Sequence, residues 1–354
     1  MVHRIHIASR DVEIACSWCF KDLCRKSHMP KVLIAPMTLA NLDGRFLQIL
    51  QHDGFEPIYP ARAAQLVEDE LMTLLKGVSA SVSGSEHYSR RVIESCPTLR
   101  VIARVGVGYD AVDLAAATER GVAVTIAPGT NHDAVAEHTF ALILGLAKNV
   151  VAHHIVTKAG QWPRKTNLPL RGCTLGIVGL GRIGKAVALR GKAFGMRLIA
   201  YEPVPDNNFV RQQNVQLMPF ERVVAEADYL TLHLPLTPEA KHLINRRTLS
   251  LMKPTAYLVN TARGGMVCEA DLLEALQNKK IAGAALDVFE KEPPGANPLF
   301  GLDNVVLTPH TAGGDLRSRD EMAESAAEAI VALRHGHWPA KKIVNPEVKA
   351  RFRW

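Results

Sequence analysis

Residues 175–186 read LGIVGLGRIGKA, a short apolar run that ends among glycines and continues into an amphipathic segment. This order is typical of a strand, a tight turn and a helix. Gly179 permits the sharp turn, Gly181 lets the main chain approach a pyrophosphate, and Gly184 lets the helix lie close to the strand. The start of the helix then offers unpaired N–H groups and the positive end of the helix dipole to the phosphates.

An acidic residue follows at the spacing that a dinucleotide requires. The next apolar strand, residues 196–201, ends at Glu202, about 20 residues beyond the glycines, where a ribose 2′-hydroxyl needs an acceptor. A glycine turn before a helix also occurs for packing alone, but the strand, the helix and the acid together favour a dinucleotide site. A carboxylate at Glu202 repels the 2′-phosphate of NADP, and Pro203 stands where an NADP-binding protein would have arginine. The sequence therefore predicts NAD as the cofactor.

The composition is that of an enzyme with two domains. The chain has 354 residues, of which 47% are hydrophobic, enough for two cores. No apolar run approaches the ~20 residues of a membrane span, no signal peptide is recognisable, and the six cysteines form no secreted framework. We therefore predict a cytoplasmic protein without a membrane partner. The net charge of +7 favours anionic small molecules, and without a nucleic-acid motif we predict no nucleic-acid partner.

Residues 1–30 differ from the rest and are interpreted as a poorly ordered N-terminal extension, of which residues 1–28 are expected to be dispensable. The spacing of Cys16 and Cys19 suits zinc, but Cys24 and His28 complete no regular second pair. We predict no metal site.

Residues 31–127 alternate between strand and helix patterns, which indicates an open parallel α/β domain. The expected strands are residues 31–36, 80–83, 101–105 and 122–126. Because the glycine turn comes later in the chain, the loops of this domain are available to a substrate. Ser83, followed by Gly84 and Ser85, and the Gly-x-Gly loop of residues 105–110 follow two of the strands, and their N–H groups could bind a carboxylate. Ordinary strand-to-helix turns are the alternative interpretation.

A second unit follows. Residues 134–151 form a helical pattern with a wide apolar arc, which must be buried within the chain or against a second copy. Strands and helices then alternate as far as residue 310, and a helix over residues 317–333 returns to the first domain. We predict two open parallel-sheet domains of the α/β class. A Rossmann-type NAD-binding domain, residues 128–317, is inserted in a substrate-binding domain, residues 31–127 plus 318–345.

Polar groups stand at the ends of the apolar strands of the second domain, where ligands of parallel sheets collect. Arg263 could pair with a carboxylate and polarise an adjacent carbonyl, although a structural ion pair is the alternative. His310 suits proton exchange near neutral pH. Glu292 or its rival Glu290 could orient that imidazole, and the residues alone do not separate the two. Asp287 could hold the amide of a nicotinamide.

Five motifs in order make the chain similar to the D-isomer-specific 2-hydroxyacid dehydrogenases, from about residue 31 to residue 345. They are GLGRIG at 179–184, HLPLT at 233–237, NTARGG at 260–265, LDVFEKEP at 286–293 and TPHTAG at 308–313.

This resemblance implies that Arg263, Glu292 and His310 are the catalytic residues, with Glu292 preferred over Glu290. It implies that Val107 and Gly108 bind the substrate carboxylate, and we add Ser83 and Arg263 as substrate-binding residues. The implied NAD contacts, to which we add Ala262 and the three glycines, are Arg182, Ile183, Glu202, Leu234, Pro235, Thr261, Asp287, His310 and Gly313. It also implies a homodimer joined through the coenzyme domains.

The resemblance predicts an NAD-dependent oxidoreductase that interconverts a D-2-hydroxy acid and its 2-oxo acid, with phosphoglycerate dehydrogenase as the closest type. Some phosphoglycerate dehydrogenases carry a phosphate-binding arginine where this chain has Val82. A glyoxylate/hydroxypyruvate reductase is therefore the alternative enzyme. An alternative of another class is an NAD-gated scaffold that resembles the C-terminal-binding-protein corepressors.

Overall fold

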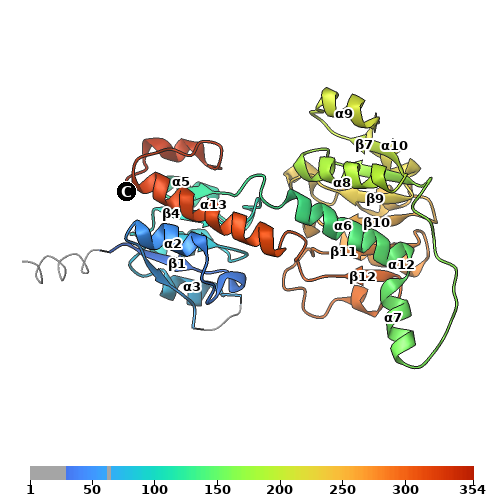
Figure 1. Cartoon of the computed structure of the whole chain (residues 1–354), viewed down its shortest axis with the longest axis horizontal. Coiled ribbons are helices and arrows are strands. Elements are labelled where there is room, and N and C mark those ends of the chain that lie inside the picture. Colours follow the sequence, from blue (N-terminus) through green and yellow to red (C-terminus); the bar gives the residue numbers. More distant parts are fainter. Residues whose placement is uncertain (1–28, 62–64) are drawn as a thin grey trace, which may run out of the picture. The chain divides into compact units, whose positions relative to one another are not determined.

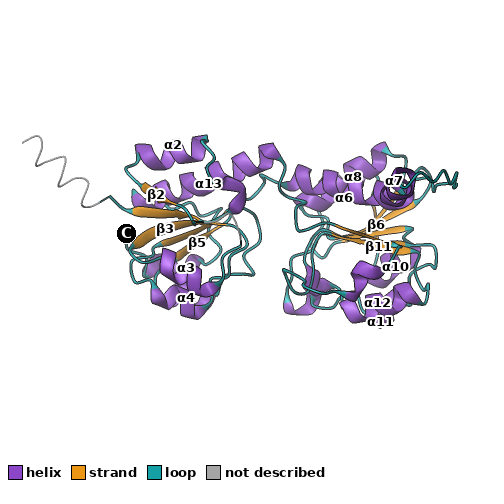
Figure 2. Cartoon of the chain, turned by 90° about the horizontal axis from the view of Figure 1, so that it is seen from below, coloured by secondary structure: helices purple, strands orange, loops and turns teal. Residues whose placement is uncertain are grey.

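The computed structural model describes residues 29–61 and 65–354, so the predictions for residues 1–28 lie outside the described residues. The chain forms two compact units (Figure 1). Of the described residues, unit 1 contains those up to Pro128 and those from Asp320 to Trp354, and unit 2 comprises Gly129–Arg319. The second division falls inside the long helix α13, Leu316–Arg334. Each unit contains a parallel sheet between two layers of helices, which confirms the predicted fold class (Figure 2).

The sheet of unit 1 has five parallel strands in the order β2-β1-β3-β4-β5. The strands are β1 (Lys31–Ile34), β2 (Glu56–Ile58), β3 (Val78–Ser83), β4 (Val101–Arg104) and β5 (Ala123–Thr125). The helices are α2 (Arg45–His52), α3 (Glu68–Leu74), α4 (Arg90–Ser95), α5 (Leu114–Glu119) and the larger part of α13, with the short turns η1 (Met37–Leu39) and η5 (Pro346–Ala350). Two apolar clusters fill this unit, one beneath α2 and α13 and the other beneath α3, α4 and α5.

The C-terminal segment covers the β5 edge of the unit 1 sheet. Ile126 donates a main-chain hydrogen bond to Lys342, and Val344 donates one to Val124, so the segment runs beside β5. Asn345 is 2% exposed and anchors the segment. Its side chain accepts a hydrogen bond from the N–H of Val124 at 2.9 Å and donates to the carbonyl of Val122 at 3.0 Å. A covered edge is protected from pairing with another chain.

The sheet of unit 2 has seven parallel strands in the order β12-β11-β10-β9-β6-β7-β8. The strands are β6 (Thr174–Val178), β7 (Arg197–Tyr201), β8 (Gln216–Leu217), β9 (Tyr229–Leu232), β10 (Tyr257–Asn260), β11 (Gly283–Leu286) and β12 (Val305–Leu307). The helices are α6 (His132–Ala147), α7 (Val150–Lys158), α8 (Arg182–Ala193), α9 (Asn207–Gln213), α10 (Phe220–Glu226), α11 (Arg246–Leu249) and α12 (Glu269–Gln277), with the turns η2 (Pro238–Ala240), η3 (Gly264–Met266) and η4 (Pro298–Gly301).

The single helix expected over residues 134–151 is two helices in the structure. α6 ends at Ala147, and Asn149 adopts a left-handed conformation with φ of 52° before α7 begins. Asparagine tolerates this conformation better than most residues, which explains a break that the apolar pattern does not reveal. α6 packs within unit 2, where the ring of Phe140 stacks on that of Phe194 with centroids 5.2 Å apart.

Among the described residues, no single helix is long and apolar enough to cross a bilayer. α6 and α7 reach that length and composition only when taken together, and they are bent by 59° at the break between them.

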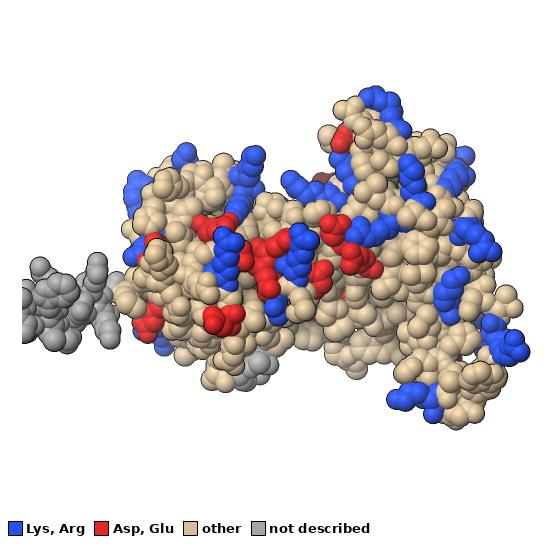
Figure 3. Space-filling model, viewed as in Figure 1, with Lys and Arg blue, Asp and Glu red and all other residues tan. Residues whose placement is uncertain are grey.

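Charges of both signs lie side by side on the face drawn in Figure 3. Acidic side chains gather over α13, whose sequence includes Asp320, Glu321 and Glu324, and Lys and Arg side chains lie beside them. Arg45 of α2 pairs with Glu324 at 3.8 Å. Since both partners are partly exposed, this ion pair contributes little to stability.

We predict that Asn345→Ala lowers the free energy of unfolding by ~2 kcal/mol, because it leaves the buried N–H of Val124 and carbonyl of Val122 without their partner. Urea unfolding followed by circular dichroism measures the change. Glu347→Ala, an exposed position two residues later, is the matched control and should change stability by less than ~0.5 kcal/mol. Equal effects of the two substitutions would contradict the anchoring role.

Candidate active site

The glycine turn between β6 and α8 leaves room where a phosphate would bind. Gly179 has φ of 97°, and a Cβ there would collide with the main chain of His233. A Cβ on Gly184 would overlap the carbonyl oxygen of Gly179, so α8 lies directly against the turn. A Cβ on Gly181, in contrast, would meet no atom within 4 Å. The main chain at the start of this 12-residue helix is therefore open to a ligand, and no side chain caps it. These residues fit a dinucleotide pyrophosphate.

Glu202 follows β7 and lies beside the glycine turn. Its Oε2 accepts the N–H of Leu180 at 2.6 Å, and its Oε1 accepts the N–H of Val204 at 3.0 Å. The carboxylate thus fixes the turn, and each oxygen keeps a lone pair with which it could accept a ribose hydroxyl. Glu202, the predicted ribose acceptor, is therefore hydrogen-bonded directly to the glycine turn, the predicted phosphate site.

The other predicted cofactor residues of unit 2 also lie at strand ends or beside them. Arg182 and Ile183 begin α8, and Leu234 and Pro235 follow β9. Thr261 and Ala262 follow β10, where the hydroxyls of Thr261 and Thr139 lie 2.9 Å apart. A Cβ on Gly313 would lie close to the side-chain amide of Asn131. All these positions lie in the unit that carries the glycine turn, and their contacts with NAD remain predictions.

Arg263 is held by the residues around it. The carbonyl of Arg263 accepts a hydrogen bond from the buried side chain of Asn260 at 2.9 Å, and the guanidinium donates to the carbonyl of Ala262 at 2.6 Å. A Cβ on the next residue, Gly264, would overlap the main-chain carbonyl of Phe289. The loop that carries Arg263 therefore packs directly on the loop that carries Glu292.

Glu292 and His310 form a hydrogen-bonded pair. Oε2 of Glu292 lies 2.6 Å from Nδ1 of His310, and Oε1 accepts the N–H of Phe289 at 2.9 Å. Burial by itself raises the pKa of Glu292. The hydrogen bond and charge of His310, the N–H of Phe289 and the charge of Arg263 lower it by more than burial raises it, so the pKa of Glu292 is below its usual value. With Nδ1 engaged, Nε2 is the nitrogen left to exchange a proton with a substrate.

The sign of this shift gives the pH dependence. Because the pKa of Glu292 is lower in the folded state, its ionised form stabilises the fold above the unfolded-state pKa of ~4.3. That contribution is lost only as the pH falls through the lowered folded-state value. The pair therefore keeps its carboxylate charge at neutral pH.

Glu290 has a different partner. Its Oε1 lies 2.5 Å from Nε2 of His242, a residue with φ of 51°, and its main-chain N–H donates to Glu269 at 2.6 Å. The structure thus pairs His310 with Glu292 and separates it from the rival carboxylate.

Asp287 is fully buried at the end of β11 and organises the loop of His310. Its carboxylate accepts the hydroxyl of Thr308 at 2.6 Å and the N–H groups of Thr311 and Ala312, both at 2.9 Å. The N–H of His310 donates to the carbonyl of Asp287 at 2.8 Å. The contact of Asp287 with the nicotinamide amide remains a prediction.

Sequence reasoning missed three residues that support this site. Asn260, buried at the end of β10, braces the Arg263 loop, and its place inside the NTARGG motif was the available signal. Thr308 and His138 extend the Asp287 network, with Nε2 of His138 lying 3.0 Å from the Thr308 hydroxyl. His138 lies on α6, far away in the sequence, where nothing distinguishes it from other helical histidines.

Unit 1 presents the predicted substrate loops. Ser83 ends β3 and Gly106 follows β4, and the two strands are neighbours in the sheet. Val107 and Gly108 lie in the second loop, where Gly106 has φ of 155°. Loops at the carboxyl ends of adjacent parallel strands are well placed to bind one ligand together.

Among residues 29–61 and 65–354, no group of three or more His, Cys, Asp or Glu side chains has the arrangement of a metal site.

Comparison with known proteins agrees with this geometry. The family model described as the NAD binding domain of D-isomer specific 2-hydroxyacid dehydrogenases matches residues 140–312. A glyoxylate reductase of Pyrococcus furiosus is 41% identical over 294 residues, which cover 80% of this chain and 87% of the relative. The chain belongs to the D-isomer specific 2-hydroxyacid dehydrogenase family.

Two further members of the family bear on cofactor and substrate. A D-3-phosphoglycerate dehydrogenase of Methanocaldococcus jannaschii is 44% identical over 288 residues, 80% of this chain and 55% of that relative. D-Lactate dehydrogenase of Aquifex aeolicus, solved with NAD and lactic acid, has a TM-score of 0.77 and 30% identity, covering 89% of this chain and 99% of that one. The matched domain is the NAD-binding domain of the family, so this dehydrogenase uses NAD, and its family acts on small 2-hydroxy or 2-oxo acids.

We predict that Glu292→Gln lowers kcat by ~100-fold, because the amide keeps the shape of the side chain but not the charge that supports proton transfer by His310. Steady-state oxidation of NADH measures this change. Glu290→Gln is the matched control, two residues away in the same loop, and should retain kcat within about twofold. An equal loss in both variants would contradict the assignment of the pair.

Proposed function

We propose that the chain reduces a small, unphosphorylated 2-oxo acid of the glyoxylate or hydroxypyruvate type to its D-2-hydroxy acid. The observation that carries this proposal is the charge of the first substrate loop. Val82 is fully buried, the loop continues as Ser83, Gly84 and Ser85, and the next residue is the buried acid Glu86. A phosphate dianion needs cationic or N–H donors in number, and this loop supplies no arginine or lysine.

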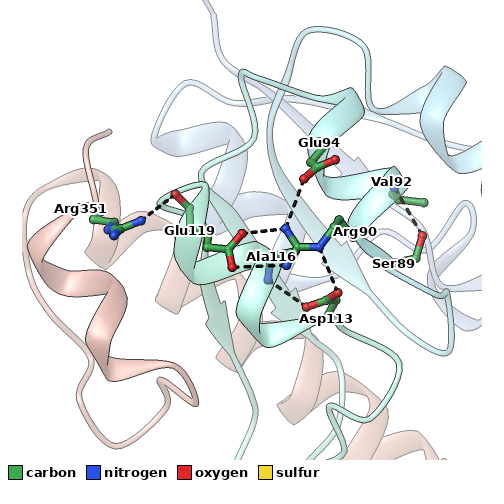
Figure 4. A network of polar contacts seen from close by, with 8 residues as sticks. All are labelled: Ser89, Arg90, Val92, Glu94, Asp113, Ala116, Glu119 and Arg351. Carbon is green, nitrogen blue, oxygen red and sulfur yellow. Dashed lines mark hydrogen bonds and ion pairs between the residues drawn. The ribbon is translucent and has the colours of Figure 1, made fainter.

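The nearest arginine after that loop is already committed to carboxylates. Arg90 at the start of α4 lies 2.6 Å from Glu119, 3.3 Å from Glu94 and 4.0 Å from Asp113 (Figure 4). Arg351 of the C-terminal segment donates to the carbonyl of Glu119 and adds to the same network. Binding a phosphate through Arg90 would first require breaking these contacts.

The residues of unit 2 supply the other parts of the reaction. NADH, when bound, supplies a hydride to the carbonyl carbon. Nε2 of His310 donates a proton to the carbonyl oxygen, and Glu292 holds the imidazole through Nδ1. Arg263 pairs with the substrate carboxylate and polarises the adjacent carbonyl. In the oxidation direction, His310 takes the proton back from the hydroxyl.

Oxidation of D-3-phosphoglycerate is the second candidate. The identity of 44% to a D-3-phosphoglycerate dehydrogenase supports it. Glyoxylate reductases match at a similar level, for example 41%, so sequence identity does not separate the two candidates. The phosphate would then have to be bound by cations outside the first substrate loop.

The test is a substrate panel under identical conditions. We predict that kcat/KM with glyoxylate or hydroxypyruvate and NADH exceeds that with phosphohydroxypyruvate by at least ~10-fold, and that D-3-phosphoglycerate with NAD is a poor substrate. Because the reaction is followed by NADH absorbance in every case, the values are directly comparable. A preference for the phosphorylated acids would instead support the second candidate.

We further propose that the protein is a homodimer joined through unit 2. α7 has no buried residue, and its Val150, Val151 and Ile155 side chains are 55%, 48% and 61% exposed. The segment that follows exposes Trp162 to 80% and then returns to α6, where Leu168 bonds to Ala147. Apolar side chains exposed together in this way are typical of a surface that another chain covers.

Ile155→Asp should convert this dimer to a monomer at micromolar concentration, because it places a charge in the apolar contact. Light scattering coupled to size-exclusion chromatography measures the mass. Leu189→Asp, a substitution of another exposed apolar residue on α8, is the control and should leave the dimer intact. A monomeric wild-type protein would contradict the proposal.

A further inference from the structure

Two loops of unit 1 leave the sheet side by side. β3 and β4 pair in parallel with Ser83 opposite Arg104, and the N–H of Val105 donates to the carbonyl of Ser83 at 2.7 Å. The loop of residues 83–85 and the loop of residues 106–108 therefore begin at the same edge of the sheet. From the sequence we expect both loops to bind the substrate, with the N–H groups of Val107 and Gly108 on its carboxylate.

A buried acid occupies the first loop. Glu86 is 3% exposed, and its Oε2 accepts the N–H of Gly84 at 2.6 Å. Burial raises the pKa of Glu86, while hydrogen bonds from its own N–H and that of Gly84, together with the charge of Arg104, oppose the rise. A carboxylate is retained inside a protein only where such partners compensate for its lost hydration. The N–H of Gly84 is consequently engaged and is not available to a substrate.

A buried cation connects the two loops. Arg104 is the last residue of β4 and is 8% exposed. Its Nε donates to the carbonyl of Gly108 at 3.1 Å, in the second loop. Its Nη1 lies 3.5 Å from the carbonyl of Glu86, at the end of the first loop. One planar guanidinium thus contacts both loops, which the single ammonium of a lysine could not do with the same geometry.

We infer that Glu86 and Arg104 are positioning residues: Glu86 fixes the first loop, Arg104 joins that loop to the second, and together they fix the N–H groups of Val107 and Gly108 for the substrate carboxylate. This inference rests on the proposed function. Both side chains are buried and are engaged by the loops, so we assign them a positioning role. Their effect passes through the loops, so it concerns substrate binding and leaves the proton and hydride steps of unit 2 unchanged.

Steady-state kinetics of Arg104→Lys, Glu86→Ala and Glu86→Gln test the inference. With glyoxylate and NADH, Arg104→Lys and Glu86→Ala should raise KM by ~10-fold while kcat stays within about threefold, because the loss of a positioning hydrogen bond weakens substrate binding. Glu86→Gln keeps an acceptor for the N–H of Gly84 and should restore KM to within about threefold of the wild type. NADH affinity, measured by fluorescence, should not change in any variant.

Arg100→Lys is the matched control. Arg100 precedes β4 and donates to the carbonyls of Pro97 and Leu99, at the opposite end of the strand. Its substitution should leave both KM and kcat unchanged. Equal effects of Arg100→Lys and Arg104→Lys, or a fall in kcat and thermal stability with unchanged KM, would overturn the inference.

A second measurement does not depend on turnover. Amide hydrogen exchange in Arg104→Lys should become faster by at least ~10-fold in the loop of residues 83–86, and Glu86→Ala should have the same effect in the loop of residues 106–109. The inference is overturned if exchange in the loop that carries no substitution stays unchanged. Each variant gives this test by itself, so one that fails to fold leaves the other. If the wild type reduces neither glyoxylate nor hydroxypyruvate, the proposed function fails, and this exchange experiment still decides whether the loops are coupled.

Discussion

The buried carboxylate of Asp287 is the contact on which the candidate active site depends. His310 has φ of 54°, a left-handed conformation that is unfavourable for a residue with a side chain. Hydrogen bonds from Thr308, Thr311 and Ala312 to one carboxylate hold the turn in that conformation. Burial raises the pKa of Asp287, but the hydrogen bonds that it accepts lower the pKa below its usual value, so the carboxylate is ionised at neutral pH. The carboxylate of Asp287 thus fixes the main chain around His310, and this places the imidazole against Glu292.

Glycines determine how closely the parts of unit 2 approach one another. At Gly184 the helix lies against the glycine turn, and at Gly264 the Arg263 loop lies against Phe289. In both places a methyl group would overlap a main-chain carbonyl. At the phosphate site and at the site of Arg263 and Glu292, one stretch of main chain therefore lies directly against another. Such packing is more rigid than contact through long side chains. Such rigidity suits chemistry in which small displacements reduce the rate.

Strand ends were the most informative feature of the sequence. Apolar runs that stop at Arg263 and Asp287 predict a parallel sheet whose polar residues share one edge, and the structure contains that sheet. The residues alone could not choose between Glu290 and Glu292, because the choice depends on which of them turns toward His310. That turn is fixed by the N–H of Phe289 and by His242, which is 48 residues from its partner Glu290.

Other features carried no readable signal. β2 is a three-residue edge strand that contains Pro57, a composition that argues against a strand by itself. Glu86 and Arg104 are buried, although charged residues in a sequence are normally assigned to the surface. Their burial follows from the pairing of β3 with β4 and from the path of two loops, which are properties of the tertiary structure.

The division of labour between the two units has a consequence for how this enzyme can diversify. The predicted catalytic residues and the glycine turn all lie in unit 2, whereas Ser83, Val107 and Gly108 lie in unit 1, and each unit has its own apolar clusters. Mutations that reshape the unit 1 loops leave the interior of the hydride-transfer unit intact. On the proposed function, substitutions in the unit 1 loops can change which acid is accepted, while the apolar core of the NAD-binding unit stays as it is.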